Sequence, residues 1–480
     1  MSTRSTLGSG LRAGEYSAAL IVTALSAAFG TVLVGAADAI VTSMRANGFD
    51  QLTEVRTVLG VMTWIFLGIA LFVGAIVTVN TFATIIAGRA RRLALLRLLG
   101  ASSASLRRSI AQEGLIVGLA GAALGWLAGA ALLQGGLAAA HTWWGLPVQT
   151  TTPWFITDAI APAVAAALVT LVSAWLGSRQ ILGISPIQAF GSAQAATESG
   201  SDARSSRTRV VIAALIAVLG LGMLALGAKM GLHSLDQAQA GLPIAFFGGV
   251  LTVTALVLAA DRVLPPLMRI APGITGSADL LAARNARRAP RRSSRSALGI
   301  LIGVGLVTMF AVAAYTYQDT LTAYATQQRE LSAEDLALFA DSMRQVLLVF
   351  LPLVGFSALI AAVGMVNTQV LATVQRQREI GLLRALGLTR RQTLWMLTAE
   401  SARSAVVAVV VGLLLGIGFG WVGALASMGE IMRKTSLWPT VPWQLVASAL
   451  AGALLLSAVS TLAASRRARR VTPLDAIAAE

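Results

Sequence analysis

A basic stretch near the end of the chain, residues 376–400, holds the side chains whose types and spacing could do chemistry. Gly387 suits the C′ position that ends a helix, because glycine readily adopts a left-handed backbone. Thr389 followed by Gln392 is the pattern of a capping box that starts the next helix. The sequence therefore predicts an arginine-rich elbow that either docks a partner protein or anchors the chain at a membrane surface.

The same pattern occurs earlier in the chain, displaced by 287 positions without a gap. Residues 80–113 and 367–400 are identical in 10 of 34 columns. A constant offset indicates an internal duplication, so we expect a second elbow around Gly100. Two copies of one elbow favour a pair of docking elements for a two-fold partner. The first-copy residues in the identical columns are Asn80, Thr81, Arg89, Arg91, Leu95, Leu96, Arg97, Leu99, Gly100 and Glu113.

Enzymatic and metal-binding motifs are missing from the sequence. A P-loop needs a lysine between glycine and a serine or threonine, because that lysine must reach the phosphates. The two lysines, Lys229 and Lys434, instead follow Ala228 and Arg433. The chain contains no cysteine, and its two histidines stand far apart. We therefore expect no catalytic residue, no metal site and no directly bound cofactor, so any ATP is used by a partner subunit.

Composition places the two elbows in a membrane protein. The 480 residues are 56% hydrophobic and 12% charged, whereas a soluble chain has about 25% charged residues. Apolar runs of about twenty residues can cross a bilayer as helices. The expected fold is an all-α polytopic membrane protein with about ten transmembrane helices. The runs lie near residues 16–41, 58–87, 111–138, 159–177, 210–230, 244–264, 296–316, 346–373, 401–426 and 444–464.

Positive charge predicts the orientation of these spans. Of the 37 lysine and arginine residues, 30 fall in alternate connecting segments that include the N-terminus. Cytoplasmic loops carry such an excess, so these segments are expected inside. The net charge of +16 is then an orientation signal and not a nucleic-acid site. We expect a multi-pass protein of a bacterial cell membrane, in contact with lipids and with both termini in the cytoplasm.

The duplication divides the chain into two repeats of four spans, separated by two extra helices. The second repeat follows the first after an even number of spans, so the repeats are parallel. The predicted segments are a cytoplasmic N-terminus at 1–15, a first repeat at 16–190, a cytoplasmic linker at 191–209, two linking helices at 210–264, a basic cytoplasmic loop at 265–295, and a second repeat at 296–480.

Paired glycines occupy matching columns of the third and ninth spans. Gly125 and Gly129 correspond to Gly412 and Gly416, and each pair has the Gly-x-x-x-Gly spacing that lets helices approach closely. We interpret them as helix-packing residues. Their matching positions predict that they line the interface between the two repeats.

Two acidic residues also match between the repeats. Glu113 and Glu400 lie at the predicted starts of the third and ninth spans. A carboxylate there suits the positive end of the helix dipole.

Tryptophans gather in two segments expected on the outer side, residues 141–154 and 438–443. They are interpreted as an aromatic belt at the membrane interface. The alternative is a docking lip for an amphiphilic substrate.

The second elbow carries a family resemblance. Its sequence, QRQREIGLLRALGLTRRQTLWMLTAES at residues 375–401, resembles the signature of the FtsX-like permease domain of ABC transporter permeases. The macrolide-exporter and lipoprotein-releasing types carry this domain. The first elbow departs from the signature, because Arg92 and Ala94 stand where Glu379 and Gly381 do. The resemblance covers roughly residues 60–190 and 345–478, and it implies two FtsX-like repeats fused in one chain.

The resemblance implies that each elbow contacts the nucleotide-binding ATPase subunit, with two ATPase copies serving the two elbows. The residues expected to carry this contact in the second elbow are Arg378, Glu379, Gly381, Arg384, Gly387, Arg390 and Arg391. The weaker counterparts in the first elbow are Arg91, Arg92, Arg97 and Gly100.

The expected function is therefore that of an ABC transporter permease subunit, which is not itself an enzyme. ATP hydrolysis by the partner would drive export, or extraction from the outer leaflet, of an amphiphilic substrate such as a lipid, lipoprotein, antibiotic or peptide. One alternative is a non-transporting member of the family that transmits ATPase motion to an outer partner. A secondary transporter is the other alternative, although its spans would carry ionisable residues at mid-membrane.

Overall fold

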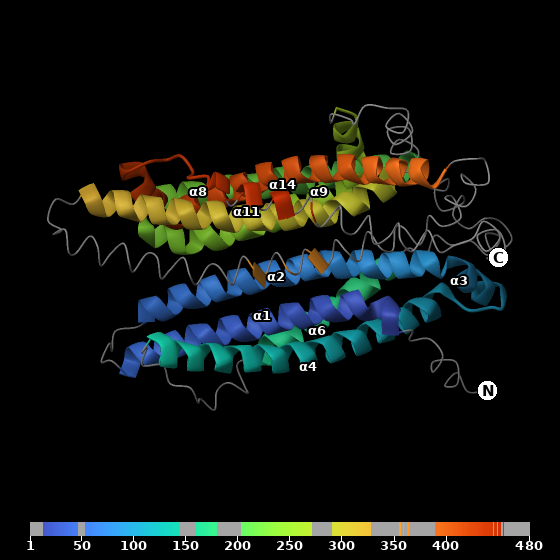
Figure 1. Cartoon of the computed structure of the whole chain (residues 1–480), viewed down its shortest axis with the longest axis horizontal. Coiled ribbons are helices and arrows are strands. Elements are labelled where there is room, and N and C mark those ends of the chain that lie inside the picture. The colour runs from blue at the N-terminus through green and yellow to red at the C-terminus, as the bar shows by residue number, and fades with distance from the viewer. Residues whose placement is uncertain are drawn as a thin grey trace. The chain divides into compact units, whose positions relative to one another are not determined.

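The computed structural model of the chain describes residues 13–46, 53–144, 160–179, 203–270, 290–327 and 389–444, with scattered positions at 355–363 and 446–455. All the regular structure in these ranges is helical (Figure 1). Eight of the helices are long and apolar enough to cross a membrane, which confirms the all-α polytopic membrane fold. The other two predicted spans, near 346–373 and 444–464, fall mostly outside the described residues.

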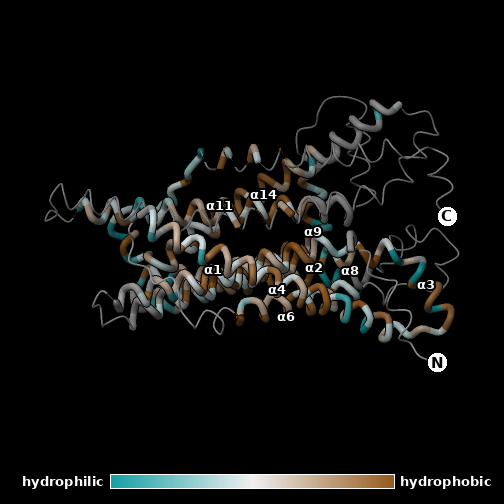
Figure 2. Tube along the Cα trace, turned by 60° about the horizontal axis from the view of Figure 1, so that its bottom comes forward, coloured by the Kyte–Doolittle hydropathy of each residue, from teal (hydrophilic) through white to brown (hydrophobic). Residues whose placement is uncertain are grey.

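The chain forms two compact units, residues 1–200 and 201–480. Apolar residues occupy most of the length of the helices in both units, as the hydropathy colouring in Figure 2 shows. The first unit contains α1 (Ala13–Ala46), α2 (Thr53–Gly88), α3 (Ala90–Leu98), α4 (Ser103–Trp144) and α6 (Ile160–Gly177). The second unit contains α8 (Ala203–His233), α9 (Leu235–Ile270), α11 (Pro290–Gln327) and α14 (Arg390–Lys434).

In the first unit, four long helices form a bundle and the short helix α3 lies at one end of it (Figure 1). The core at this end joins all five helices. Phe82 of α2 is fully buried there, beside Leu93 and Ala94 of α3, Ile110 of α4 and Ala174 of α6. Burial of these apolar side chains ties α3 to the bundle, so the elbow is part of a packed structure.

The paired glycines pack helices inside each repeat. A Cβ on Gly129 of α4 would lie 2.7 Å from the carbonyl oxygen of Ala28 in α1. A Cβ on Gly412 of α14 would lie 2.7 Å from the carbonyl oxygen of Leu301 in α11. Real Cβ atoms do not approach so closely, so glycine is required where the backbones cross. Gly125 and Gly416 make equally close contacts with α1 and α11, respectively.

The prediction that these glycines line the interface between the two repeats was therefore wrong. Their close contacts are with the first helix of their own repeat. Sequence matching shows that two sites are equivalent, but it cannot tell which neighbouring helix each site faces.

The same contacts show that the first spans are duplicated too, with a different offset. Gly129 meets Ala28 and Thr31, and its counterpart Gly416 meets Gly305 and Thr308. Those contact residues are 277 positions apart, as are the first residues of α1 and α11. The elbows are 287 positions apart. The second repeat thus has ten more residues than the first between this helix crossing and its elbow.

The two linking helices, α8 and α9, pack against α14. A Cβ on Gly429 of α14 would lie 2.8 Å from the backbone nitrogen of Leu232 in α8. Ala426 of α14 is fully buried with Leu224 of α8 and Ala245 of α9. The additional spans therefore brace the third span of the second repeat, a role that the sequence left open.

The segment after α14 holds part of the predicted tryptophan group. The rings of Trp421 and Trp438 stack with their centroids 6.3 Å apart, and the hydroxyl of Thr440 donates to Asp319 Oδ2 at 2.8 Å. Trp438 and Trp443 remain 77% and 71% exposed. Exposed tryptophans next to a span end suit a membrane interface.

Candidate functional site

The first elbow ends helix α3 with a left-handed glycine. Gly100 has a φ of 94°, and its N–H donates to the carbonyl of Arg97 at 3.0 Å. The next N–H, of Ala101, donates to the carbonyl of Leu96 at 3.0 Å. These two bonds form a Schellman motif, which ends a helix and turns the chain. The prediction that Gly100 is the C′ residue is confirmed.

Both re-entering helices are capped as predicted. In the first repeat, Ser102 Oγ accepts from the N–H of Ser105 at 3.1 Å. In the second repeat, Thr389 Oγ1 accepts from the N–H of Gln392 at 3.3 Å, and Gln392 Oε1 accepts from the N–H of Thr389 at 2.9 Å. This reciprocal pair is a capping box. From these caps α4 runs for 42 residues and α14 for 45, so each elbow leads directly into a span.

The exposed surface of the first elbow is mostly leucine. Leu99 is 84% exposed at its tip, and Arg92 in the first turn of α3 is also exposed. Leu99 lies beyond the apolar segment Gly60–Gly88 of α2. An exposed apolar tip can insert into a hydrophobic groove of a partner protein. Three further leucines of the elbow are exposed: Leu95, Leu96 and Leu98.

The sequence prediction places the contact on arginines, glycines and Glu379, and it does not include the leucines that the structure shows to be exposed. The available signal was the duplication itself, because three of the four leucines are identical in both repeats: Leu95, Leu96 and Leu99 match Leu382, Leu383 and Leu386.

The other predicted contact residues are described only in part. Arg97 is half-buried, and the side chain of Arg91 lies outside the described residues although its backbone is part of α3. The same holds for Arg390 and Arg391 in the first turn of α14. Five predicted residues of the second elbow lie wholly outside the described residues: Arg378, Glu379, Gly381, Arg384 and Gly387.

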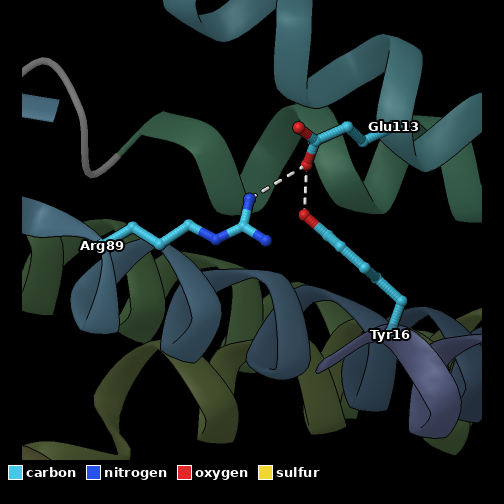
Figure 3. Close-up of polar contacts among 3 residues, drawn as sticks. All are labelled: Tyr16, Arg89 and Glu113. Carbon is cyan, nitrogen blue, oxygen red and sulfur yellow. Dashed lines mark hydrogen bonds and ion pairs between the residues drawn. The ribbon is translucent and has the colours of Figure 1, made fainter. Parts of the chain in front are cut away.

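Beneath the first elbow, one carboxylate joins three helices (Figure 3). Glu113 Oε2 of α4 accepts a hydrogen bond from the hydroxyl of Tyr16 at the start of α1. The same oxygen lies 3.3 Å from Arg89 Nη1, and Arg89 is the residue between α2 and α3. The guanidinium also lies 5.3 Å from the centre of the Tyr16 ring, a cation–π distance. Both charged side chains are mostly buried, with 22% and 17% exposed for Arg89 and Glu113.

The dipole interpretation of Glu113 was wrong. Helix α4 begins at Ser103 and not near residue 111, so Glu113 lies almost three turns inside the helix. The favourable effect of the helix dipole is confined to the first turn. The ion pair with Arg89 explains the carboxylate instead.

A second polar group lies at the same end of the bundle, between α4 and α6. Arg107 Nε donates to Ser178 Oγ at 3.2 Å. Its guanidinium lies 4.6 Å from the centre of the Trp175 ring, and Arg179 stacks on that ring at 5.4 Å. The end of the bundle next to the elbow is thus held by charged and aromatic side chains.

The part of each repeat that contains the elbow and the span after it matches a known protein family. The FtsX-like permease C-terminal family matches residues 64–186 and 353–473. The two matches together cover half of the chain, and each includes one elbow. The chain belongs to the FtsX-like permease family. The resemblance of the second elbow is confirmed, and the family domain occurs twice.

Individual relatives of the FtsX-like chain match over shorter stretches. The uncharacterized ABC transporter permease YknZ of Bacillus subtilis is 30% identical over 26% of this chain and 29% of its own length. The macrolide export ATP-binding/permease protein MacB of Nitrobacter winogradskyi is 31% identical over 29% of this chain and 20% of its own. The pyoverdine export ATP-binding/permease protein PvdT of Pseudomonas savastanoi is 29% identical over 26% and 18%, respectively. The matched stretch is thus under one third of each of these relatives.

Proposed function

We propose that this chain is the permease subunit of an ABC transporter, driven by a separate ATPase that binds both elbows. Support comes from the two FtsX-like matches and from relatives named as ABC transporter permeases and exporters. The observation that carries the proposal is the first elbow itself. It is a short helix packed on the bundle, ended by a Schellman turn, with an apolar tip at Leu99 that is 84% exposed.

The proposed mechanism uses the elbow as a lever. A partner that grips the tip moves α3, and the packed core formed with Leu93 and Ala94 passes the motion to the bundle. Helix α4 begins immediately after the elbow and continues for 42 residues, about 63 Å at 1.5 Å per residue. Since the hydrocarbon core is about 30 Å thick, one rigid helix joins the elbow to the far side of the membrane.

The proposed cargo is an amphiphilic molecule exported from a bacterial cell or withdrawn from the outer leaflet. Two relatives are named for the export of macrolides and of pyoverdine. Two elbows imply two copies of the ATPase, one for each elbow.

The test is purification of the tagged full chain from membranes of its native host, followed by measurement of vanadate-sensitive ATP hydrolysis. We expect an ABC ATPase to co-purify and Leu99→Asp to reduce the associated activity about tenfold, because a charge at the centre of an apolar contact costs at least 1.4 kcal/mol. Thr142→Asp is the matched control, since Thr142 is exposed at the opposite end of α4. Equal ATPase activity in wild type and Leu99→Asp would contradict the assignment of the elbow.

A further inference from the structure

The position of Arg89 makes its ion pair more than a surface contact. Arg89 is a turn residue between α2 and α3, with φ −99° and ψ 8° as the residue preceding α3. Its side chain reaches back to Glu113, more than two turns beyond the start of α4. The pair therefore connects the entry to the elbow with the span that leaves it.

A packing role alone does not account for these residues. A mostly buried ion pair is a weak source of stability, because desolvation of both charges offsets their attraction. Apolar side chains of similar volume would hold the helices together at least as well. An ion pair with a shared acceptor does fix direction, since Glu113 Oε2 must face both Arg89 Nη1 and the hydroxyl of Tyr16. The group is thus suited to setting the angle of the elbow.

The internal duplication separates the roles of the three residues. The charged pair has the same residue types in the second repeat, Arg376 and Glu400. The first spans correspond with an offset of 277 positions, so the counterpart of Tyr16 is Ser293 of α11. The tyrosine is therefore specific to the first repeat.

We propose that Arg89, Glu113 and Tyr16 are positioning residues that lock the first elbow to α1 and α4, so that elbow and span move as one body. Tyr16 is an additional fastening, and the matching position in the second repeat holds Ser293. That the lock transmits motion from the ATPase rests on the proposed function. The lock itself can be tested without a partner protein.

The test measures how firmly the elbow is held relative to α4. The chain has no cysteine, so spin labels can be placed at Leu99→Cys on the elbow and Leu119→Cys on α4, both exposed positions. In the full chain in lipid nanodiscs, we expect a narrow distance distribution between the labels. Glu113→Gln should at least double its width. Tyr16→Phe, which removes only the hydroxyl, should give an intermediate width.

Two variants separate a positioning role from general destabilisation. Asp261→Asn breaks the Arg209–Asp261 pair, which has the same 3.3 Å separation but joins α8 to α9, and it should leave the distribution unchanged. Arg89→Glu combined with Glu113→Arg restores the opposite charges and should narrow the distribution again. An unchanged width in Glu113→Gln that still elutes as a monodisperse protein would overturn the proposal.

A second readout uses the complex with the co-purified ATPase. Glu113→Gln should still bind the ATPase, because the exposed leucines are intact, but it should lose most of the stimulation of ATP hydrolysis by the permease. If no ATPase binds the wild-type chain, the proposed function fails while the label distances still test the lock. If Glu113→Gln binds the ATPase and is stimulated as strongly as wild type, the lock does not transmit motion.

Discussion

At the scale of single residues, Gly100 and Glu113 shape the elbow in different ways. Gly100 contributes a backbone conformation, and Glu113 contributes one oxygen that meets two donors, one on α1 and one in the turn between α2 and α3. Local spacing reveals the first, because the end of a helix leaves a pattern in the sequence. It cannot reveal the second, because the partners of Glu113 lie 97 and 24 residues away.

Replacing Gly100 with alanine should loosen the elbow. A φ of 94° is unfavourable for an L-residue by about 1–2 kcal/mol. We expect the amides of α3 and its C-terminal turn to exchange hydrogen about ten times faster, measured by mass spectrometry of the full chain. Gly136→Ala is the control, since Gly136 is helical and a Cβ there meets nothing within 4 Å. Unchanged exchange across residues 90–101 would contradict this account.

At the scale of helices, the contact between the first and third spans of each repeat depends on glycine. Gly129→Ala should force α4 away from α1, because its Cβ would lie 2.7 Å from a backbone oxygen. Overpacking of this kind costs about 1–3 kcal/mol. Thermal unfolding in detergent, followed by circular dichroism, should show a lower midpoint for Gly129→Ala than for Gly135→Ala on the open side of the same helix. Equal midpoints would show that the helices can separate without cost.

The helices also show where sequence reasoning stops. Apolar runs predict the spans, and the Thr389 capping box marks the start of α14 to the residue. The neighbours of each span are not encoded so simply, because one apolar face suits lipid, α1 or α8 equally well. For that reason the glycines were assigned to the wrong interface, and the packing of α8 and α9 on α14 was not foreseen.

At the scale of the whole molecule, the distribution of arginine makes the orientation testable. Both elbows are predicted to face the cytoplasm, with 30 of 37 basic residues on that side. Ala104→Cys and Thr142→Cys place one thiol at each end of α4, both at exposed positions. A membrane-impermeant maleimide should label Thr142→Cys in intact cells. It should label Ala104→Cys only after the cells have been permeabilised. The reverse pattern would invert the predicted topology.

The two repeats share some structural features and differ in others. Each contains the elbow sequence, a third span with a capped first turn, and a glycine contact between its first and third spans. Among the described residues, α8 and α9 pack on the third span of the second repeat, and Tyr16 donates to the carboxylate of the first repeat. The duplication predicted the shared features from sequence, whereas these differences required the three-dimensional contacts.

The shared glycine crossing records the order of events in the history of this gene. Gly129 on Ala28 and Gly416 on Gly305 are the same contact made twice, although the spacing to the elbow differs by ten residues. A contact present in both copies is expected to predate the duplication. The ten residues were gained or lost after the gene had doubled, and the crossing tolerated that change.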